Sequence, residues 1–145
     1  MGQFALERLD QPIVDHGWQG IVLIFADEAH LGFQADTVAL FECFDLFCLS
    51  SLREGLPNVV LEAMAMEVPV LATRCGGIEA FGHDGADMLT VPAGSADALA
   101  GGLRRLAGDA GLRERLAKTA RARIEAEFSF RRRMERMAEV YELLW

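Results

Sequence analysis

Positive charge is scarce in most of this chain. Among its 145 residues there is a single lysine, Lys118, and up to Ala100 only three cations stand beside 15 acids, which gives this part a charge of −12. From Gly101 onward 11 cations outnumber 7 acids, so the remainder carries +4. A strongly acidic body disfavours a nucleic acid as the main partner. For the basic C-terminal part, peripheral contact with an anionic membrane surface stays open beside the simpler interpretation as a solvated helix face.

The chain also lacks long apolar runs and paired cysteines. No segment reaches the length that spans a bilayer, and residues 1–15 show no basic stretch followed by an apolar one. Three cysteines, Cys43, Cys48 and Cys75, form neither a CxxC pair nor an even set, so we interpret them as buried thiols in a reducing cytosol. We therefore expect a cytoplasmic protein, with contact to the inner membrane face as an open hypothesis. Its length and 52% hydrophobic content fit one globular domain.

Strand and helix signals alternate through the first two thirds of the sequence. Such alternation predicts an α/β fold with a Rossmann-like parallel sheet and helices on both faces. After it come three helical patterns, of which Ser95 and Ser129 are predicted to cap the first and the third, so we expect a helical C-terminal segment. The predicted strands are 21–25, 46–49, 69–72 and 88–91, and the helices between them are 37–44, 58–66 and a short one near residue 78.

Two carboxylates eight positions apart, Glu54 and Glu62, frame a transition from loop to helix. Gly55 and Pro57 end the preceding strand, and proline is favoured at the start of a helix, so Glu54 should lie in a loop and Glu62 about one turn inside the helix. Both can then face one crevice, with the helix N-terminus between them as a site for phosphate. The pattern suits a nucleotide-sugar. The alternatives are a helix-capping role for Glu54 and a plain exposed position for Glu62.

A second loop, residues 73–78, follows the next strand along the chain. In parallel sheets ligands bind outside the carboxyl ends of the strands, so this loop and the loop at 50–57 should converge on one crevice. Gly76 and Gly77 fit either a turn that faces the ligand or a tight turn that needs positive φ. Glu79 is predicted to be a first-turn helix acid.

From Leu31 onward the sequence resembles the C-terminal, donor-binding half of a GT-B, family 4 (group 1) glycosyltransferase, over about four fifths of the chain. A lone pair of glutamates at this spacing would be weak evidence for a family, but here it stands amid ordered matches. The matching segments are 31–34, 45–51, 53–65, 69–73, 76–79, 84–85, 91–94, 128–129 and 141–144.

The resemblance implies a retaining enzyme that transfers a sugar from a nucleotide diphosphate to a hydroxyl of a sugar or lipid-linked acceptor, without a metal or other cofactor. It implies that Glu54 is the catalytic carboxylate beside the donor sugar and that Glu62 grips the ribose. A carboxylate fits this reaction, because it stabilises the oxocarbenium-like positive charge of the transition state. The other donor-binding residues that it implies are Gly32, Phe33 and Gln34 at the base, Arg53, Gly55 and Leu56 in the loop, and the backbone of Asn58, Val59 and Val60 at the diphosphate.

The sequence departs from the family in what is missing. Glu67 stands where members usually carry glycine, and residues 1–30 contain no equivalent of the arginine and lysine that hold the donor phosphates, since Arg8 is alone. We interpret residues 1–145 as a single nucleotide-sugar-binding domain that lacks the acceptor domain and the first strand-helix unit.

Other functions stay open. The chain can be a non-catalytic module that serves a separate acceptor-domain chain, or one that self-associates through an apolar stripe on its last helix. An unrelated nucleotide-binding protein such as an epimerase is disfavoured, because no Gly-x-Gly-x-x-Gly follows the first strand.

Overall fold

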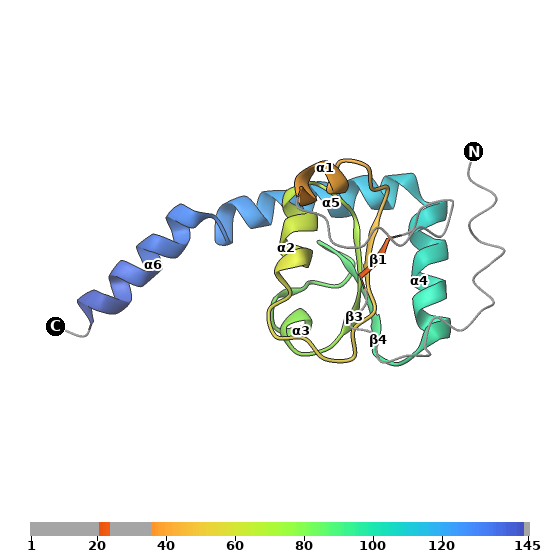
Figure 1. The fold of residues 1–145 in the computed structure, drawn as a ribbon, viewed down its shortest axis with the longest axis horizontal. Helices are drawn as coiled ribbons and strands as arrows, with labels where there is room; N and C mark the ends of the chain where they lie inside the picture. The colour runs from red at the N-terminus through yellow and green to blue at the C-terminus, as the bar shows by residue number, and fades with distance from the viewer. Residues whose placement is uncertain (1–20, 24–35, 144–145) are drawn as a thin grey trace.

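The computed structural model describes residues 21–23 and 36–143 (Figure 1). In this part four strands and six helices follow the predicted order: strand and helix alternate up to the last strand, and three helices come after it. The strands are β1 (Ile21–Leu23), β2 (Phe47–Leu49), β3 (Val70–Arg74) and β4 (Leu89–Pro92). The helices are α1 (Thr37–Phe41), α2 (Asn58–Ala65), α3 (Gly77–Phe81), α4 (Ala96–Gly108), α5 (Ala110–Glu127) and α6 (Phe130–Glu142).

The strands form one sheet in the order β1-β2-β3-β4. β2, β3 and β4 are parallel, with Phe47 opposite Val70 and Leu71 opposite Leu89. This parallel core confirms the predicted fold class. β1 differs from the expectation, because it pairs with β2 in the antiparallel sense. An apolar run predicts a buried strand but not its direction, and an edge strand has only one neighbour to fix it.

Helices cover both faces of the sheet because strand side chains alternate between the faces. Phe47 and Val70 pack with the buried side chains of α2 and α3, whereas Cys48 and Leu71 pack with those of α4. Figure 1 shows α2 and α3 on one side of the strands and α4 on the other. α5 contributes Ala120 to the first cluster and leucines to the second, so it joins the two halves of the core.

The predicted helix starts at Ser95 and Ser129 are confirmed. The Ser95 hydroxyl accepts from the amide of Ala98 at 3.2 Å, and the Ser129 hydroxyl accepts from the amide of Arg132 at 3.4 Å. Between them Asp109 caps α5 through the amide of Leu112 at 2.8 Å. These side chains satisfy amides that have no partner inside the helix.

α6 extends away from the body of the molecule (Figure 1) and buries none of its residues. The exposed fractions of Met134, Met137 and Tyr141 are 45%, 41% and 60%. The apolar stripe predicted on this helix is therefore uncovered in the chain as described. Among the described residues, no helix has both the length and the apolar character that crossing a bilayer requires.

The cysteines divide by burial. Cys48 and Cys75 are buried, as predicted, but the prediction for Cys43 is wrong, because this residue is exposed. It lies in the turn after α1, where its thiol donates to the carbonyl of Ala39 at 3.4 Å. The next residue, Phe44, packs against the core instead, so residue type alone does not decide which side chain of a turn is covered.

Candidate functional site

The loop that carries Glu54 joins β2 to α2 at the carboxyl end of the strand. α2 begins at Asn58, directly after Pro57, as the sequence predicts. Glu62 is the fifth residue of this helix and is exposed, on the side away from the buried residues Val60 and Ala63. The two carboxylates therefore lie in the elements predicted for them, one in the loop and one in the first turns of the helix.

The predicted convergence of two loops is confirmed by hydrogen bonds between them. The Thr73 hydroxyl donates to the carbonyl of Ser51, and the Cys75 thiol contacts the same carbonyl at 3.4 Å. Farther along, the amide of Gly77 donates to the carbonyl of Glu54 at 3.3 Å. The end of β3 and the residues after it therefore hold the loop after β2 in place at several points.

Gly76 and Gly77 permit this approach because they lack a side chain. A Cβ atom at Gly76 would lie 1.9 Å from the carbonyl oxygen of Glu54, and one at Gly77 would lie 1.6 Å from that of Gly55. Gly76 also has φ of +46°, a conformation that other residues adopt with strain. The glycine pair therefore forms a tight turn, and that turn packs directly on the backbone of the Glu54 loop.

The Glu54 side chain is half-buried, and one of its oxygens is occupied. The Ser51 hydroxyl donates to Glu54 Oε1 at 2.6 Å, and Ser51 itself is 1% exposed. Within the described part of the chain, no amide of α2 donates to the Glu54 carboxylate. The alternative in which Glu54 caps α2 is therefore wrong, and this carboxylate is held by the loop itself.

The N-terminus of α2 is left open by its cap residue. Pro57 makes no side-chain hydrogen bond to the helix, and the amide of Val60 already donates to the Pro57 carbonyl at 3.0 Å. The amides of Asn58 and Val59 remain without a partner in the described part. Free amides and the positive end of the helix dipole favour an anion there.

The remaining predicted donor residues lie on the rim or outside the described residues. Arg53, Gly55 and Leu56 are exposed in the loop, and Arg74 is an exposed cation at the end of β3. Gly32, Phe33 and Gln34, predicted at the base, lie outside the described residues.

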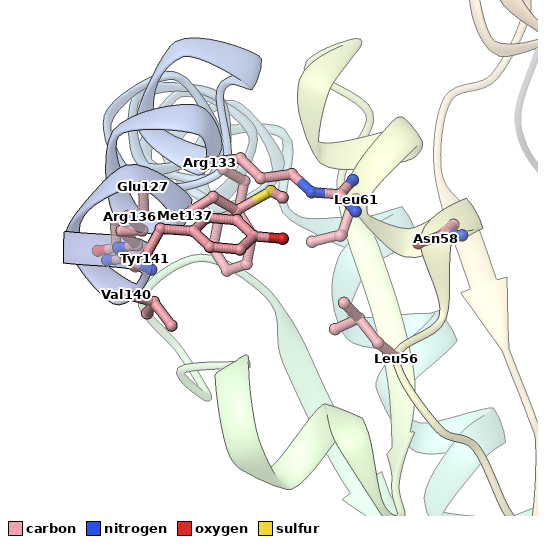
Figure 2. A pocket seen from close by; sticks show the side chains of 10 residues that line it. Leu56, Asn58, Leu61, Glu127, Arg133, Arg136, Met137, Val140 and Tyr141 are labelled. Atoms are coloured by element: carbon pink, nitrogen blue, oxygen red, sulfur yellow. The ribbon is translucent and has the colours of Figure 1, made fainter. Parts of the chain in front are cut away.

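A groove of about 790 Å³ separates the start of α2 from α6 (Figure 2). Figure 2 shows Leu56, Asn58 and Leu61 on one wall and the side chains of α6 on the other. Two predicted donor residues thus border the groove, whereas Glu54 and Glu62 do not line it. The full lining is Leu56, Asn58, Leu61, Glu127, Phe128, Arg133, Arg136, Met137, Val140 and Tyr141.

Two residues of the site were not among those singled out from the sequence. Ser51 stands three positions before Glu54, and this short separation is the signal that could have identified it. Thr73 is 22 residues away from Ser51, and no local pattern connects the two. In the described residues, no cluster of three or more metal-ligating side chains occurs.

Comparison with known proteins gives one consistent family. The family model described as "Glycosyl transferases group 1" matches residues 27–109. The lipopolysaccharide core biosynthesis glycosyltransferase LpsE of Rhizobium meliloti (strain 1021) is 37% identical over 98 residues, which are 68% of this chain and 29% of that protein. The chain thus spans less than a third of the length of this relative.

Solved structures agree with the sequence match. The structure of Anabaena HepE in complex with UDP superposes with a TM-score of 0.74 at 26% identity, covering 77% of this chain and 31% of HepE. The C-terminal domain of the group 1 family protein LpcC from Francisella tularensis has a TM-score of 0.63 at 26% identity, covering 69% of this chain and 53% of that domain. The α/β fold described above therefore matches part of the GT-B glycosyltransferase fold.

Proposed function

Because this chain belongs to the glycosyl transferases of group 1, we propose that it is the nucleotide-sugar-binding domain of a retaining glycosyltransferase. The reaction moves a sugar from a nucleotide diphosphate to an acceptor hydroxyl and keeps the anomeric configuration. The observation that carries the proposal is the position of Glu54. Its loop is fixed against the glycine turn after β3, immediately before the open N-terminus of α2.

Each part of the proposed donor has a matching group in this arrangement. The free amides of Asn58 and Val59 meet the diphosphate and stabilise it as it leaves. Glu54 lies beside the sugar, where a carboxylate stabilises oxocarbenium-like charge. Glu62 accepts hydrogen bonds from the ribose hydroxyls. No metal is required in this scheme, because the helix terminus and the neighbouring Arg53 supply the positive potential.

The choice of a first ligand comes from a structural neighbour. Anabaena HepE in complex with UDP-glucose superposes on this chain with a TM-score of 0.73 at 26% identity. UDP and UDP-glucose are therefore the first probes for this chain, with GDP and GDP-mannose as the alternative base.

We expect calorimetric titration of the purified chain to show binding of one of these nucleotides, weakened because the usual pair of phosphate-binding cations is missing. Glu62→Ala should abolish the binding, since it removes the ribose ligand. Glu114→Ala is the matched control, because Glu114 is also an exposed helix glutamate and pairs with Lys118 of the same helix, α5. The same titration in EDTA should give the same affinity.

If wild type binds none of the four nucleotides, the donor-binding proposal is wrong for this chain. If Glu62→Ala and Glu114→Ala bind equally well, the nucleotide lies elsewhere and the role of Glu62 is refuted.

A second candidate is a binding module without turnover of its own, which works with a separate acceptor-domain chain. The exposed apolar side of α6, with Met134, Met137 and Tyr141, favours this candidate, because such a face on a folded domain commonly marks an interaction surface. Transfer of the sugar to an acceptor by the chain alone would exclude it. Binding of UDP-glucose without any turnover would support it.

A further inference from the structure

We propose that Ser51 is a positioning residue that sets the orientation of the Glu54 carboxylate toward the donor sugar. This inference rests on the proposed function, in which Glu54 lies beside that sugar. Ser51 is 1% exposed, and its hydroxyl donates to Glu54 Oε1 at 2.6 Å. A hydrogen bond to a charged acceptor is short and strong compared with one between neutral groups. It fixes one carboxylate oxygen and leaves the other, Oε2, for a ligand.

Ser51 is held in turn by β3. The Thr73 hydroxyl, which is 3% exposed, donates to the Ser51 carbonyl, and the Cys75 thiol contacts the same oxygen at 3.4 Å. Because the Ser51 backbone is fixed from the neighbouring strand, its hydroxyl approaches Glu54 from a defined direction. Buried residues that support a ligand-binding side chain in this way determine its geometry without touching the ligand.

The Glu54 side chain needs this support because the contacts with the glycine turn act on the backbone of the loop. The next residue, Gly55, is exposed, and a Cβ atom there would meet no atom within 4 Å. The backbone of Glu54 is held at its carbonyl by Gly77, but this bond does not fix the side-chain torsions. Without the Ser51 hydroxyl, the half-buried carboxylate would sample several rotamers and meet the sugar in only some of them.

The test compares ligands with and without the sugar. Ser51→Ala should weaken UDP-glucose binding about tenfold and change UDP binding less than about twofold, because UDP lacks the group that Glu54 contacts. Thr73→Val, which removes one hydroxyl at nearly constant volume, should give the same selective loss in smaller measure. Ser95→Ala removes the cap hydroxyl of α4 and should lower the melting temperature without changing the ratio of the two affinities.

A double-mutant cycle separates positioning from a structural role. In a Glu54→Ala background, Ser51→Ala should cause no further loss of UDP-glucose affinity, because the carboxylate that it orients is gone. An undiminished further loss would overturn the inference, as would equal loss of UDP and UDP-glucose in Ser51→Ala alone. If wild type and Ser51→Ala bind UDP-glucose with the same affinity, the positioning role is refuted and the proposed function is not. If wild type binds GDP instead of UDP, the same comparison uses GDP and GDP-mannose. Absence of binding of all four ligands in wild type would refute the proposed function and this inference together.

Discussion

At the residue scale, Glu67 occupies a position that suits glycine. Its φ is +56°, and it follows the last turn of α2 in a Schellman arrangement. The amide of Val68 donates to the carbonyl of Ala63 at 2.9 Å, and the amide of Glu67 donates to that of Met64 at 3.2 Å. A left-handed residue at this point of the motif is usually glycine. Glu67, where the family usually carries glycine, is therefore held in a strained backbone conformation by the end of α2.

We predict that Glu67→Gly raises the free energy of unfolding by about 1 kcal/mol, because it relieves the left-handed strain. The matched control is the same substitution in the interior of the same helix. Glu62→Gly should lower the free energy of unfolding by about 1 kcal/mol, since glycine is a poor helix former. Urea denaturation measures both, and a loss of stability in Glu67→Gly would contradict the assigned backbone conformation.

Because of Cys48, the free energy of unfolding should depend on pH in the alkaline range. Burial in the core raises the pKa of its thiol from 9.0 to about 12. Above pH 9 the unfolded chain releases this proton while the folded chain keeps it, so the stabilising contribution is present below pH 9 and is lost as the pH rises toward 12. We expect the free energy of unfolding to fall by about 1.4 kcal/mol per pH unit from this group in that window.

The comparison that isolates this effect is Cys48→Ala, followed by urea denaturation at several pH values from neutral to alkaline. The variant is less stable at every pH because of the cavity, so the slope against pH is the quantity to compare. Equal slopes for the two proteins would show that Cys48 does not titrate as assigned.

At the element scale, α5 is fastened to the loop before β4 by a buried ion pair. Asp87, which is 1% exposed, accepts from the guanidinium of Arg123, and its other oxygen accepts from the amide of His83 at 2.9 Å. The His83 ring lies 3.4 Å from the same carboxylate. The Arg123 guanidinium also lies 5.8 Å from the centre of the Phe128 ring. This cluster joins Asp87 and Arg123, which are 36 positions apart in the sequence.

We predict that Asp87→Ala lowers the free energy of unfolding by about 3 kcal/mol, because it leaves a largely buried guanidinium without its partner. Glu114→Ala is the control, since it breaks the ion pair with Lys118, in which both side chains are about two-thirds exposed. Exposed pairs contribute little, so the control should unfold at the same denaturant concentration as wild type. A similar effect of the two substitutions would contradict the burial of the Asp87 pair.

At the scale of the whole molecule, α6 does not share the core that the sheet forms with the other helices. The core ends with Ala120 on α5 and the flanking Ile124 and Phe128, and no residue of α6 is buried. The stability of the chain should therefore arise from residues up to Phe128. α6 contributes an exposed apolar face and one wall of the groove beside Leu56.

We predict that a chain ending at Ser129 keeps the free energy of unfolding within about 0.5 kcal/mol of wild type and keeps its UDP affinity. A chain ending at Arg115 should not fold, because it also lacks Leu116 and Ala120 of the core. Thermal denaturation followed by circular dichroism distinguishes the two. If the chain that ends at Ser129 did not fold, α6 would have to pack on the domain.

Local patterns in the sequence predicted the order of strands and helices, the caps at Ser95 and Ser129, and the loop and helix that hold Glu54 and Glu62. These features depend on residues within one helical turn or one strand of each other, so periodicity and cap residues are enough to predict them. The meeting of the two loops also followed, because parallel strands end at the same edge of a sheet.

Tertiary packing settled the features that join distant residues. Examples are the antiparallel direction of β1, the exposure of Cys43, and the pairing of Asp87 with Arg123 across 36 positions. Thr73 reaches the carbonyl of Ser51 only because β2 and β3 are neighbours in the sheet. Such contacts depend on which surfaces come together when the core closes, and no pattern within a short segment carries that information.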